Sequence, residues 1–175
     1  DESGITTKMT RTHARAPQGQ RALGAVPFGS WQRLTVLGAL SCDGVLAAMS
    51  IEAATSTPVF LAYLEQVLVP ELNRVKPDAV VVMDNLRPHK SGAVGRVLAA
   101  AGVGLIYLPR YSPDFNPIEP GWSKVKTRLR AKAARSIETD EGQLLLLWLR
   151  LTDQDVEIEV GFEDGTSDEF DDDDE

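Results

Sequence analysis

Residues 105–126 read LIYLPRYSPDFNPIEPGWSKVK, and this stretch decides the fold and chemistry expected of the whole chain. Its first four residues are apolar and have the length and composition of a β-strand. Three prolines and an Asp-Phe-Asn sequence come next and predict a loop, because proline fixes φ and has no N–H to donate. A helix is then expected, with Pro117 or Pro120 in its first turn and Glu119 close to that turn. One carboxylate therefore lies between a rigid loop and a helix start, where its oxygens are held in place.

A second carboxylate of the same kind lies upstream. Residues 78–85 read DAVVVMDN, a continuous apolar run that predicts a strand buried on both faces and ending at Asp84. The carboxyl ends of such strands are the edge at which α/β proteins build their sites. The third candidate is Asp1, in DESG. Taken alone, the proline-rich loop could equally be an ordinary surface connection, but the recurrence of carboxylates favours a site.

Three motifs, in order along the chain, resemble the catalytic core of DDE transposases. They are DESG at residues 1–4, VMDNLRPHK at 82–90 and LPRYSPDFNPIE at 108–119, of which the last is the most specific. Among these transposases the chain most resembles the bacterial insertion-sequence branch of the mariner-like superfamily. That branch keeps an interval of 34 residues between its last two catalytic acids, as found here between Asp84 and Glu119. The resemblance covers about residues 1–150.

The resemblance implies an enzyme that cleaves phosphodiester bonds at transposon ends and transfers the strand into target DNA. Its catalytic, metal-binding residues would be Asp1, Asp84 and Glu119. Carboxylate oxygens suit Mg²⁺, which keeps several of its waters, and Mn²⁺ is expected to substitute for it. Two ions about 4 Å apart can activate the nucleophile and stabilise the leaving oxygen, with Asp84 shared between them.

Neighbouring polar residues have roles that the sequence leaves open. Asn85 and Asn116 are candidates for orienting the carboxylates from behind. His89, five residues after Asp84, could hydrogen-bond near the site, contact phosphate or be purely structural. Glu2 is not expected to be a ligand, because adjacent residues of a strand point to opposite faces.

Charge is distributed unevenly along the chain. The net charge is −8, but residues 153–175 hold 13 of the 26 acids and no Lys or Arg. Residues 1–152 therefore carry 18 basic and 13 acidic side chains, a net charge of +5. A basic body suits DNA as a partner, although so small an excess is also compatible with an ordinary solvated surface.

Bulk features predict a soluble cytoplasmic protein, and the resemblance implies a bacterial one that is associated with the nucleoid. The single cysteine, Cys42, excludes an internal disulfide and fits a reducing compartment. No apolar run approaches the roughly 18 residues of a membrane span, so no contact with a membrane is expected.

Hydrophobic periodicity and turn residues predict the order of elements. We expect strands at 21–26 (weak), 31–39 and 44–51, a helix at 57–68 with Thr57 as N-cap, a strand at 79–84, a helix at 91–101, a strand at 103–108, a helix after Glu119 and a last helix at 138–151. This order predicts an α/β ribonuclease-H-like fold with a mixed central sheet flanked by helices, and the resemblance implies the same.

The helix after Glu119 has an apolar face, with Trp122, Val125 and Leu129, and a basic face. Basic residues recur there at three- to four-residue spacing, namely Lys124, Arg128, Lys132 and Arg135. A basic face is usually only a solvated surface, but beside a phosphodiester-cleaving site contact with DNA is the favoured interpretation. In residues 4–30 the resemblance implies a hairpin that can approach DNA, with a mobile loop as the alternative.

The two ends of the chain depart from the family pattern. The chain begins at Asp1, so the first strand is expected to be truncated, and the helix-turn-helix region that the resemblance implies upstream is not in the sequence. Residues 1–152 are expected to form the catalytic domain, and residues 153–175 an acidic, disordered tail.

The favoured function is a transposase catalytic domain, acting as a homodimer because cutting two transposon ends calls for two subunits. One alternative is another ribonuclease-H-like endonuclease, against which the YSPDFNPIE motif and the 34-residue interval argue. The other is a non-catalytic remnant that binds DNA or pairs with full-length transposase.

Overall fold

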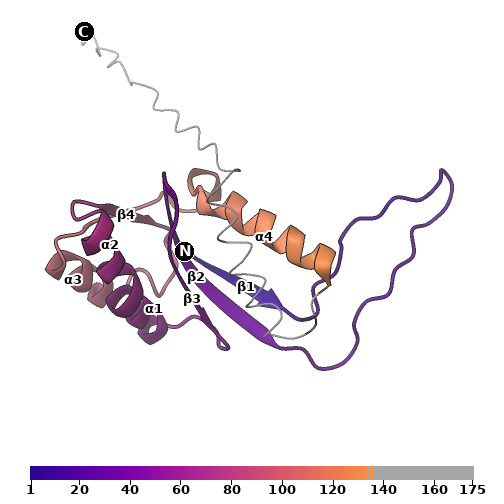
Figure 1. Cartoon of the computed structure of the whole chain (residues 1–175), viewed down its shortest axis with the longest axis horizontal. Helices are drawn as coiled ribbons and strands as arrows, with labels where there is room; N and C mark the ends of the chain where they lie inside the picture. Colours follow the sequence, from indigo (N-terminus) through magenta and orange to yellow (C-terminus); the bar gives the residue numbers. More distant parts are fainter. Residues whose placement is uncertain (134, 136–175) are drawn as a thin grey trace, which may run out of the picture.

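A computed structural model describes residues 1–133 and residue 135, and their elements form two groups of strands with helices around them (Figure 1). An antiparallel sheet contains β1 (Glu2–Thr6), β2 (Arg33–Ser41) and β3 (Gly44–Ile51). A parallel pair contains β4 (Val80–Met83) and β5 (Gly104–Tyr107), in register from Val80 opposite Gly104 to Met83 opposite Tyr107. Within the described part of the chain these are two separate hydrogen-bonded sheets.

Helices cover the antiparallel sheet on both faces (Figure 1). On one side lie α1 (Thr57–Tyr63), α2 (Val69–Val75) and α3 (Gly92–Ala100), and on the other lies α4 (Ile118–Lys132). Strand β2 supplies both layers because its side chains alternate: Leu34 and Val36 pack towards α4, and Leu37 packs towards α1–α3. The core therefore has two parts, one on each face of the same strands.

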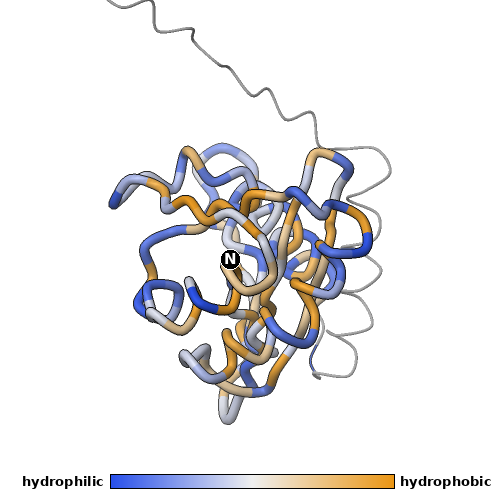
Figure 2. The backbone as a smooth tube through the Cα atoms, turned by 90° about the vertical axis from the view of Figure 1, so that its left-hand side faces the viewer, coloured by the Kyte–Doolittle hydropathy of each residue, from blue (hydrophilic) through white to orange (hydrophobic). Residues whose placement is uncertain are grey.

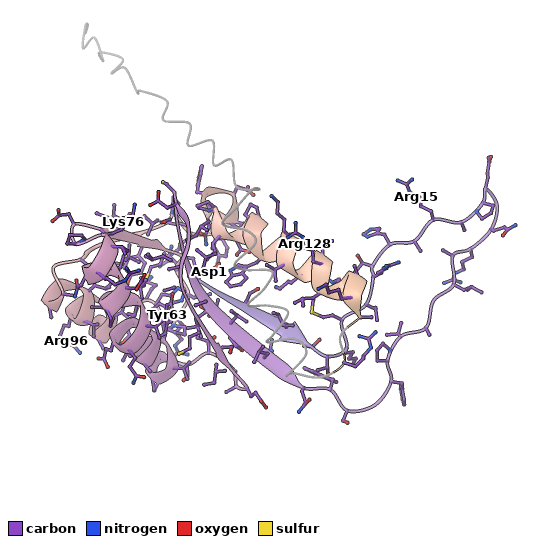
Figure 3. All side chains as sticks on the ribbon, viewed as in Figure 1. Asp1, Arg15, Tyr63, Lys76, Arg96 and Arg128 are labelled. Atoms are coloured by element: carbon purple, nitrogen blue, oxygen red, sulfur yellow. The ribbon has the colours of Figure 1, made fainter. Side chains whose placement is uncertain are left out.

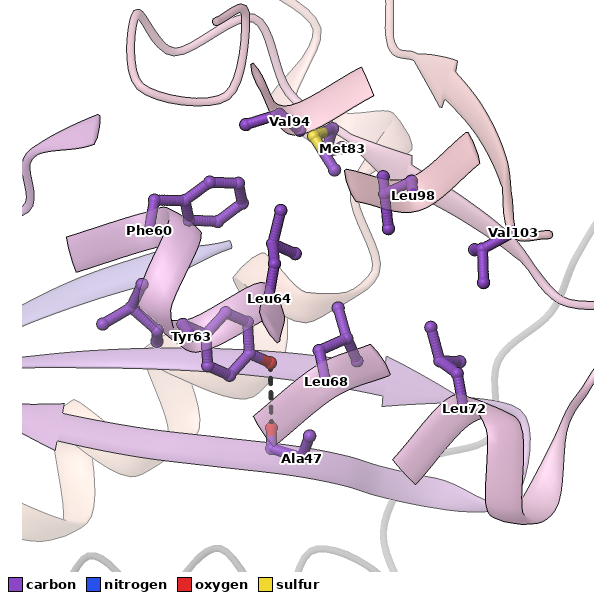
Figure 4. Close-up of a cluster of buried hydrophobic side chains, with 11 residues drawn as sticks. Ala47, Phe60, Tyr63, Leu64, Leu68, Leu72, Met83, Val94, Leu98 and Val103 are labelled. Atoms are coloured by element: carbon purple, nitrogen blue, oxygen red, sulfur yellow. Dashed lines mark hydrogen bonds between the residues drawn. The ribbon is translucent and has the colours of Figure 1, made fainter. Parts of the chain in front are cut away.

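The larger part of the core lies between the sheets and helices α1–α3 (Figure 4). It includes Phe60, Leu64, Leu68 and Leu72 from the first helical run and Val94 and Leu98 from α3. Met83 of β4 and Val103, just before β5, join them, so this cluster connects the parallel pair to the rest of the molecule.

The first helical run is longer than the sequence predicted. It was expected to end at residue 68, but a π-helical segment at Leu64–Leu68 leads directly into α2, which ends at Val75. Pro70 is accommodated because it falls in the first turn of α2, while the Val69 N–H bonds back to the Leu64 carbonyl across the wider π turn. The N-cap is Ser56, not Thr57 as predicted.

The later strands and helices lie close to their predicted positions, and the first strand does not. The hairpin predicted from Asp43-Gly44 is present, with Ser41 paired to Gly44 and Gly44 at φ +111°. No strand lies at 21–26 in the structure, and the first strand is β1, directly after Asp1. Its buried positions are Ser3 and Ile5, so one of the two buried side chains is polar and the hydropathy pattern does not reveal the strand.

The segment between β1 and β2 forms a long loop that projects away from the body of the molecule (Figure 1). Arg135, beyond α4, donates from its guanidinium to the main-chain carbonyls of Thr7 and Met9, at 3.3 and 3.0 Å, and so holds the start of this loop. No helix in the described residues is long and apolar enough to cross a membrane. The predicted helix at 138–151 and the acidic segment 153–175 lie outside the described residues.

Candidate active site

Three separate elements carry the predicted acids. Asp1 directly precedes β1, Asp84 directly follows β4, and Glu119 lies in the first turn of α4. Asp84 and Glu119 line one open cleft of about 580 Å³. Asn116, which lines the same cleft, donates from its side-chain amide to Asp1 Oδ2 at 3.4 Å. The fold therefore brings the three acids into one region of the molecule.

Asp1 is fixed by the β1–β2 ladder. Its main-chain nitrogen donates to the Gly38 carbonyl at 3.0 Å, and the Gly38 N–H donates to the Asp1 carbonyl at 2.8 Å. Its carboxylate accepts the Glu2 N–H through Oδ1, at 2.8 Å. In two perpendicular views this end of the chain lies near the middle of the molecule (Figures 1 and 2), and Asp1 is half-buried.

Asp84 is held by the loop that follows it. Its Oδ1 accepts the Leu86 N–H at 3.0 Å and contacts His89 Nδ1 at 2.5 Å. The other ring nitrogen of His89, Nε2, lies 2.8 Å from Glu2 Oε2. His89 is fully buried, with its ring packed against Phe60 at a centroid distance of 4.2 Å. Of the roles left open for His89, the structure shows a hydrogen bond at the site.

Electrostatics in this group favour charged partners. Burial by itself lowers the pKa of His89, but the hydrogen bonds to Asp84 and Glu2 and the charge of Glu2 outweigh it, so the pKa is raised above its ordinary value. Burial by itself raises the pKa of Asp84, but the hydrogen bonds from His89 and from the Leu86 N–H outweigh it and hold the pKa of that carboxyl below its ordinary value. The imidazole of His89 and the carboxylate of Asp84 thus stabilise each other's charged forms.

Sequence reasoning missed the part played by Glu2. The side chain of Glu2 turns away from that of Asp1, as the alternation of strand residues predicts, and meets His89 instead. No local pattern in the sequence marks this contact, because Glu2 and His89 are 87 residues apart and are brought together only by the tertiary fold.

The two asparagines differ in what they touch. Asn116 bonds to the Asp1 carboxylate, as described above, and its carbonyl accepts the Glu119 N–H at 3.0 Å, so it also fixes the start of α4. The side-chain amide of Asn85 donates to the main-chain carbonyl of Leu108. Asn85 therefore joins the ends of β4 and β5, and does not bond to an acid within the described residues.

The loop from β5 to α4 builds the other wall of the cleft. Pro113–Phe115 form a short 3₁₀ turn, Pro117 caps α4, and α4 starts at Ile118, in agreement with the predicted helix start. Tyr111, with φ +59°, is 99% exposed at the rim. Exposed cationic side chains line the same cleft, namely Arg87, Lys90 and Arg110.

The four basic residues predicted to contact DNA do not form one uniform surface. Lys124 and Lys132 are exposed on α4, and Arg128, which projects from the same helix, is half-buried (Figure 3). Arg135 is bound to the carbonyls of Thr7 and Met9. A fifth cation, Lys126, lies half-buried two turns after Glu119, where burial lowers its pKa against the opposing charge of Glu119.

The atoms available as metal ligands are of the type that a hard divalent cation prefers. Asp84 Oδ1 is used by His89 and Leu86, and no hydrogen bond within the described chain uses Oδ2. Asp84, Asp1 and Glu119 offer only carboxylate oxygens, which Mg²⁺ and Mn²⁺ prefer. No group of three His, Cys, Asp or Glu side chains in the described residues is already arranged to hold a metal, but Mg²⁺ keeps several waters and needs only one or two protein carboxylates.

Comparison with known proteins agrees with this architecture. A family model described as DDE superfamily endonuclease matches residues 1–141. The Transposable element Tcb1 transposase of Caenorhabditis briggsae is 35% identical over 69 residues, which is 39% of this chain and 25% of that protein. The Mos1 transposase paired-end complex with left transposon end superposes with a TM-score of 0.68 at 20% identity, over 85% of this chain and 46% of the Mos1 chain. The Mos1 mariner paired end complex with Mn gives a TM-score of 0.66 at 21% identity, over 86% and 47% of the two chains.

The mixed α/β fold is therefore the ribonuclease-H-like fold of the Mos1 catalytic domain. The chain belongs to the DDE superfamily endonuclease family, as a catalytic domain of the DDE transposase type. It spans less than half of the Mos1 chain and a quarter of the Tcb1 transposase. The relatives do not distinguish the bacterial insertion-sequence branch, which stays a prediction.

Proposed function

We propose that this domain cleaves phosphodiester bonds of DNA at transposon ends and joins the freed strand to target DNA, in a metal-dependent reaction. The observation that carries the proposal is the cleft lined by Asp84 and Glu119, with Asp1 bonded to its wall through Asn116. Family membership supports the reaction type, and the cleft supports the choice of residues.

Asp1, Asp84 and Glu119 are proposed to hold the cation through their carboxylate oxygens. A divalent ion bound there supplies a Lewis acid that polarises the phosphate and lowers the pKa of a bound water. Two ions with Asp84 as the shared ligand remain the expectation from the resemblance. The complex of Mos1 with Mn supports the use of a divalent metal here.

The cationic residues are proposed to bind the DNA backbone. Arg87, Lys90 and Arg110 surround the cleft at a position where the scissile phosphate would enter, and arginine suits phosphate because its planar guanidinium donates two parallel hydrogen bonds. Lys124, Arg128 and Lys132 on α4 would contact DNA further from the acids. Two subunits are proposed in the active complex, since two transposon ends are cut.

The test is nicking of a supercoiled plasmid by the full chain, with Mn²⁺ and with chelator. We expect Mn²⁺-dependent nicking by the wild type, and a loss of at least about 100-fold in Asp84→Asn and in Glu119→Gln, because each removes a charged metal ligand. Glu52→Gln is the matched control, since Glu52 is an exposed carboxylate outside the cleft. Nicking that survives in both site variants, or none by the wild type, contradicts the proposal and favours a non-catalytic role.

A further inference from the structure

We propose that Glu2 is a positioning residue for Asp84 and acts on it through His89. The inference rests on the proposed function, because Asp84 matters here as a metal ligand. It assigns to Glu2 neither metal binding nor contact with DNA.

The geometry is a continuous chain of three side chains from β1 to the end of β4. Glu2 Oε2 lies 2.8 Å from His89 Nε2, and His89 Nδ1 lies 2.5 Å from Asp84 Oδ1. The side chain of His89 is 0% exposed, and that of Glu2 is 13% exposed. Each ring nitrogen therefore has one carboxylate partner, and the ring itself is closed to solvent.

Other contacts leave the imidazole one orientation. Phe60 packs against the ring with an interplanar angle of 40°. The Tyr107 hydroxyl donates to the main-chain carbonyl of His89 at 2.7 Å, which fixes the backbone from β5. The ring and the backbone of His89 are thus both held in place. A displacement of the Glu2 carboxylate from Nε2 would therefore shift Nδ1, the atom that contacts Asp84.

As a consequence, the two carboxylate oxygens of Asp84 have different roles. Oδ1 receives His89 and the Leu86 N–H, so the carboxylate plane is set and Oδ2 is kept for a ligand. Groups that orient a metal ligand from behind typically contribute about 10- to 100-fold to metal affinity.

The chain of side chains also joins the two sheets. Strands β1 and β4 are not hydrogen-bonded to each other in the described residues, and they carry different acids. Because Asp1 and Glu2 are adjacent, this end of the chain contributes to the site twice. Asp1 is one of its carboxylates, and Glu2, on the opposite face, positions a second one, Asp84. The relative position of Asp1 and Asp84 is therefore set by the residue that follows Asp1.

The experiment measures Mn²⁺ affinity of the full chain at fixed neutral pH, from the electron paramagnetic resonance signal of free Mn²⁺. Two variants distinguish the effect of the length of the Glu2 side chain from the effect of its charge. Glu2→Gln keeps the length of the side chain and an amide that can bond to Nε2, but removes the charge. Glu2→Asp keeps the charge, but withdraws the carboxylate from Nε2 by one carbon–carbon bond.

We expect Glu2→Asp to raise the Mn²⁺ dissociation constant about tenfold, and Glu2→Gln to leave it within about threefold of the wild type. Melting of each variant without metal shows that the folded protein is being titrated, and Glu52→Asp is the control for the substitution itself. The reverse order, in which Glu2→Gln binds Mn²⁺ more weakly than Glu2→Asp, would overturn the inference. It would mean that Glu2 acts through its negative charge or as a direct metal ligand. Wild-type affinity in both variants would also overturn it.

Failure of the proposed function gives a different result in the same titration. In that case the wild type binds no Mn²⁺, or Asp84→Asn binds it as tightly as the wild type does. Either outcome removes the metal site itself, and the positioning role of Glu2 with it.

Discussion

His89 shows how much a single residue can depend on partners far away in sequence. It follows Asp84 by five residues, but its second partner, Glu2, is 87 residues away. The local motif therefore limited the role of His89 to a few possibilities, and the tertiary contact decided among them. Asn116 is comparable, since its partner Asp1 is 115 residues away.

Tyr63 supports a prediction about alkaline pH. It is buried in α1 and its hydroxyl donates to the Ala47 carbonyl at 3.4 Å (Figure 4). Burial raises the pKa of Tyr63 well above its ordinary value of 10.0. Because the folded-state pKa is the higher one, this group contributes stability below about pH 10, and the contribution is lost as pH rises towards the folded-state pKa.

We therefore expect the melting temperature of the wild type to fall more steeply above about pH 10 than that of Tyr63→Phe, which has no phenol to ionise. Thermal melts of both proteins from about pH 8 to about pH 11 measure the difference, in which the titration of other tyrosines and lysines cancels. Parallel curves would show that Tyr63 does not resist ionisation.

At the scale of elements, α4 joins the core to the site. Its predicted apolar face is confirmed, because Trp122, Val125 and Leu129 are all buried against Ile5, Leu34 and Val36 of the sheet. The same helix carries Glu119 in its first turn, so this packing also holds a carboxylate of the site.

Trp122→Ala tests that packing. We expect a loss of about 3–5 kcal/mol in the free energy of unfolding, because a large aromatic side chain is removed from a fully buried position. Urea unfolding measures it, and Ser123→Ala, exposed on the same helix, should stay within about 0.5 kcal/mol of the wild type. A loss for Trp122→Ala no greater than that of the control would mean that α4 is not packed on the sheet as described.

The elements that the sequence predicted well are those with a strong periodic pattern or a clear turn. The β2–β3 hairpin has Asp43-Gly44, and α3 has Ser91 as an N-cap that accepts the Ala93 N–H. Strand β1 was expected only as a truncated first strand and its bounds were not predicted, because one of its two buried positions is Ser3, which carries no hydrophobic signal. The extension of the first helical run was missed because Pro70 normally ends a helix, and no local pattern predicts a π turn that accommodates it.

The residues of the candidate site also differ in how far the sequence could predict them. The shared cleft of Asp84 and Glu119 could be predicted, because Asp84 follows one recognisable strand, Glu119 follows the loop after the next, and the ends of parallel strands meet at one edge of a sheet. Neither the contact of Glu2 with His89 nor the use of Asn85 between β4 and β5 follows from any local pattern, since both depend on how distant strands are placed.

At the scale of the whole molecule, the charge distribution leads to a prediction about the proposed binding of DNA. The body of residues 1–152 has a net charge of +5, and residues 153–175 add 13 acids. We expect replacement of the last five residues, DDDDE, by NNNNQ to strengthen binding to a DNA duplex, because it raises the net charge from −8 to −3.

Fluorescence anisotropy of a labelled duplex measures this effect, and the gain should shrink as salt is added, because screening weakens the repulsion between the acids and DNA. An unchanged or weakened affinity at low salt would show that these acids do not oppose DNA binding.

The central claim is that Asp84 and Glu119 are ligands of one divalent cation, and thermal melting with Mn²⁺ tests it most directly. Ligand at 100 times its dissociation constant stabilises a folded protein by about 2.7 kcal/mol, which for a chain of this size corresponds to a rise of about 5–10 °C. We predict such a rise for the wild type, and its loss in both Asp84→Asn and Glu119→Gln. An equal rise in all three proteins, or no rise in the wild type, would contradict the account.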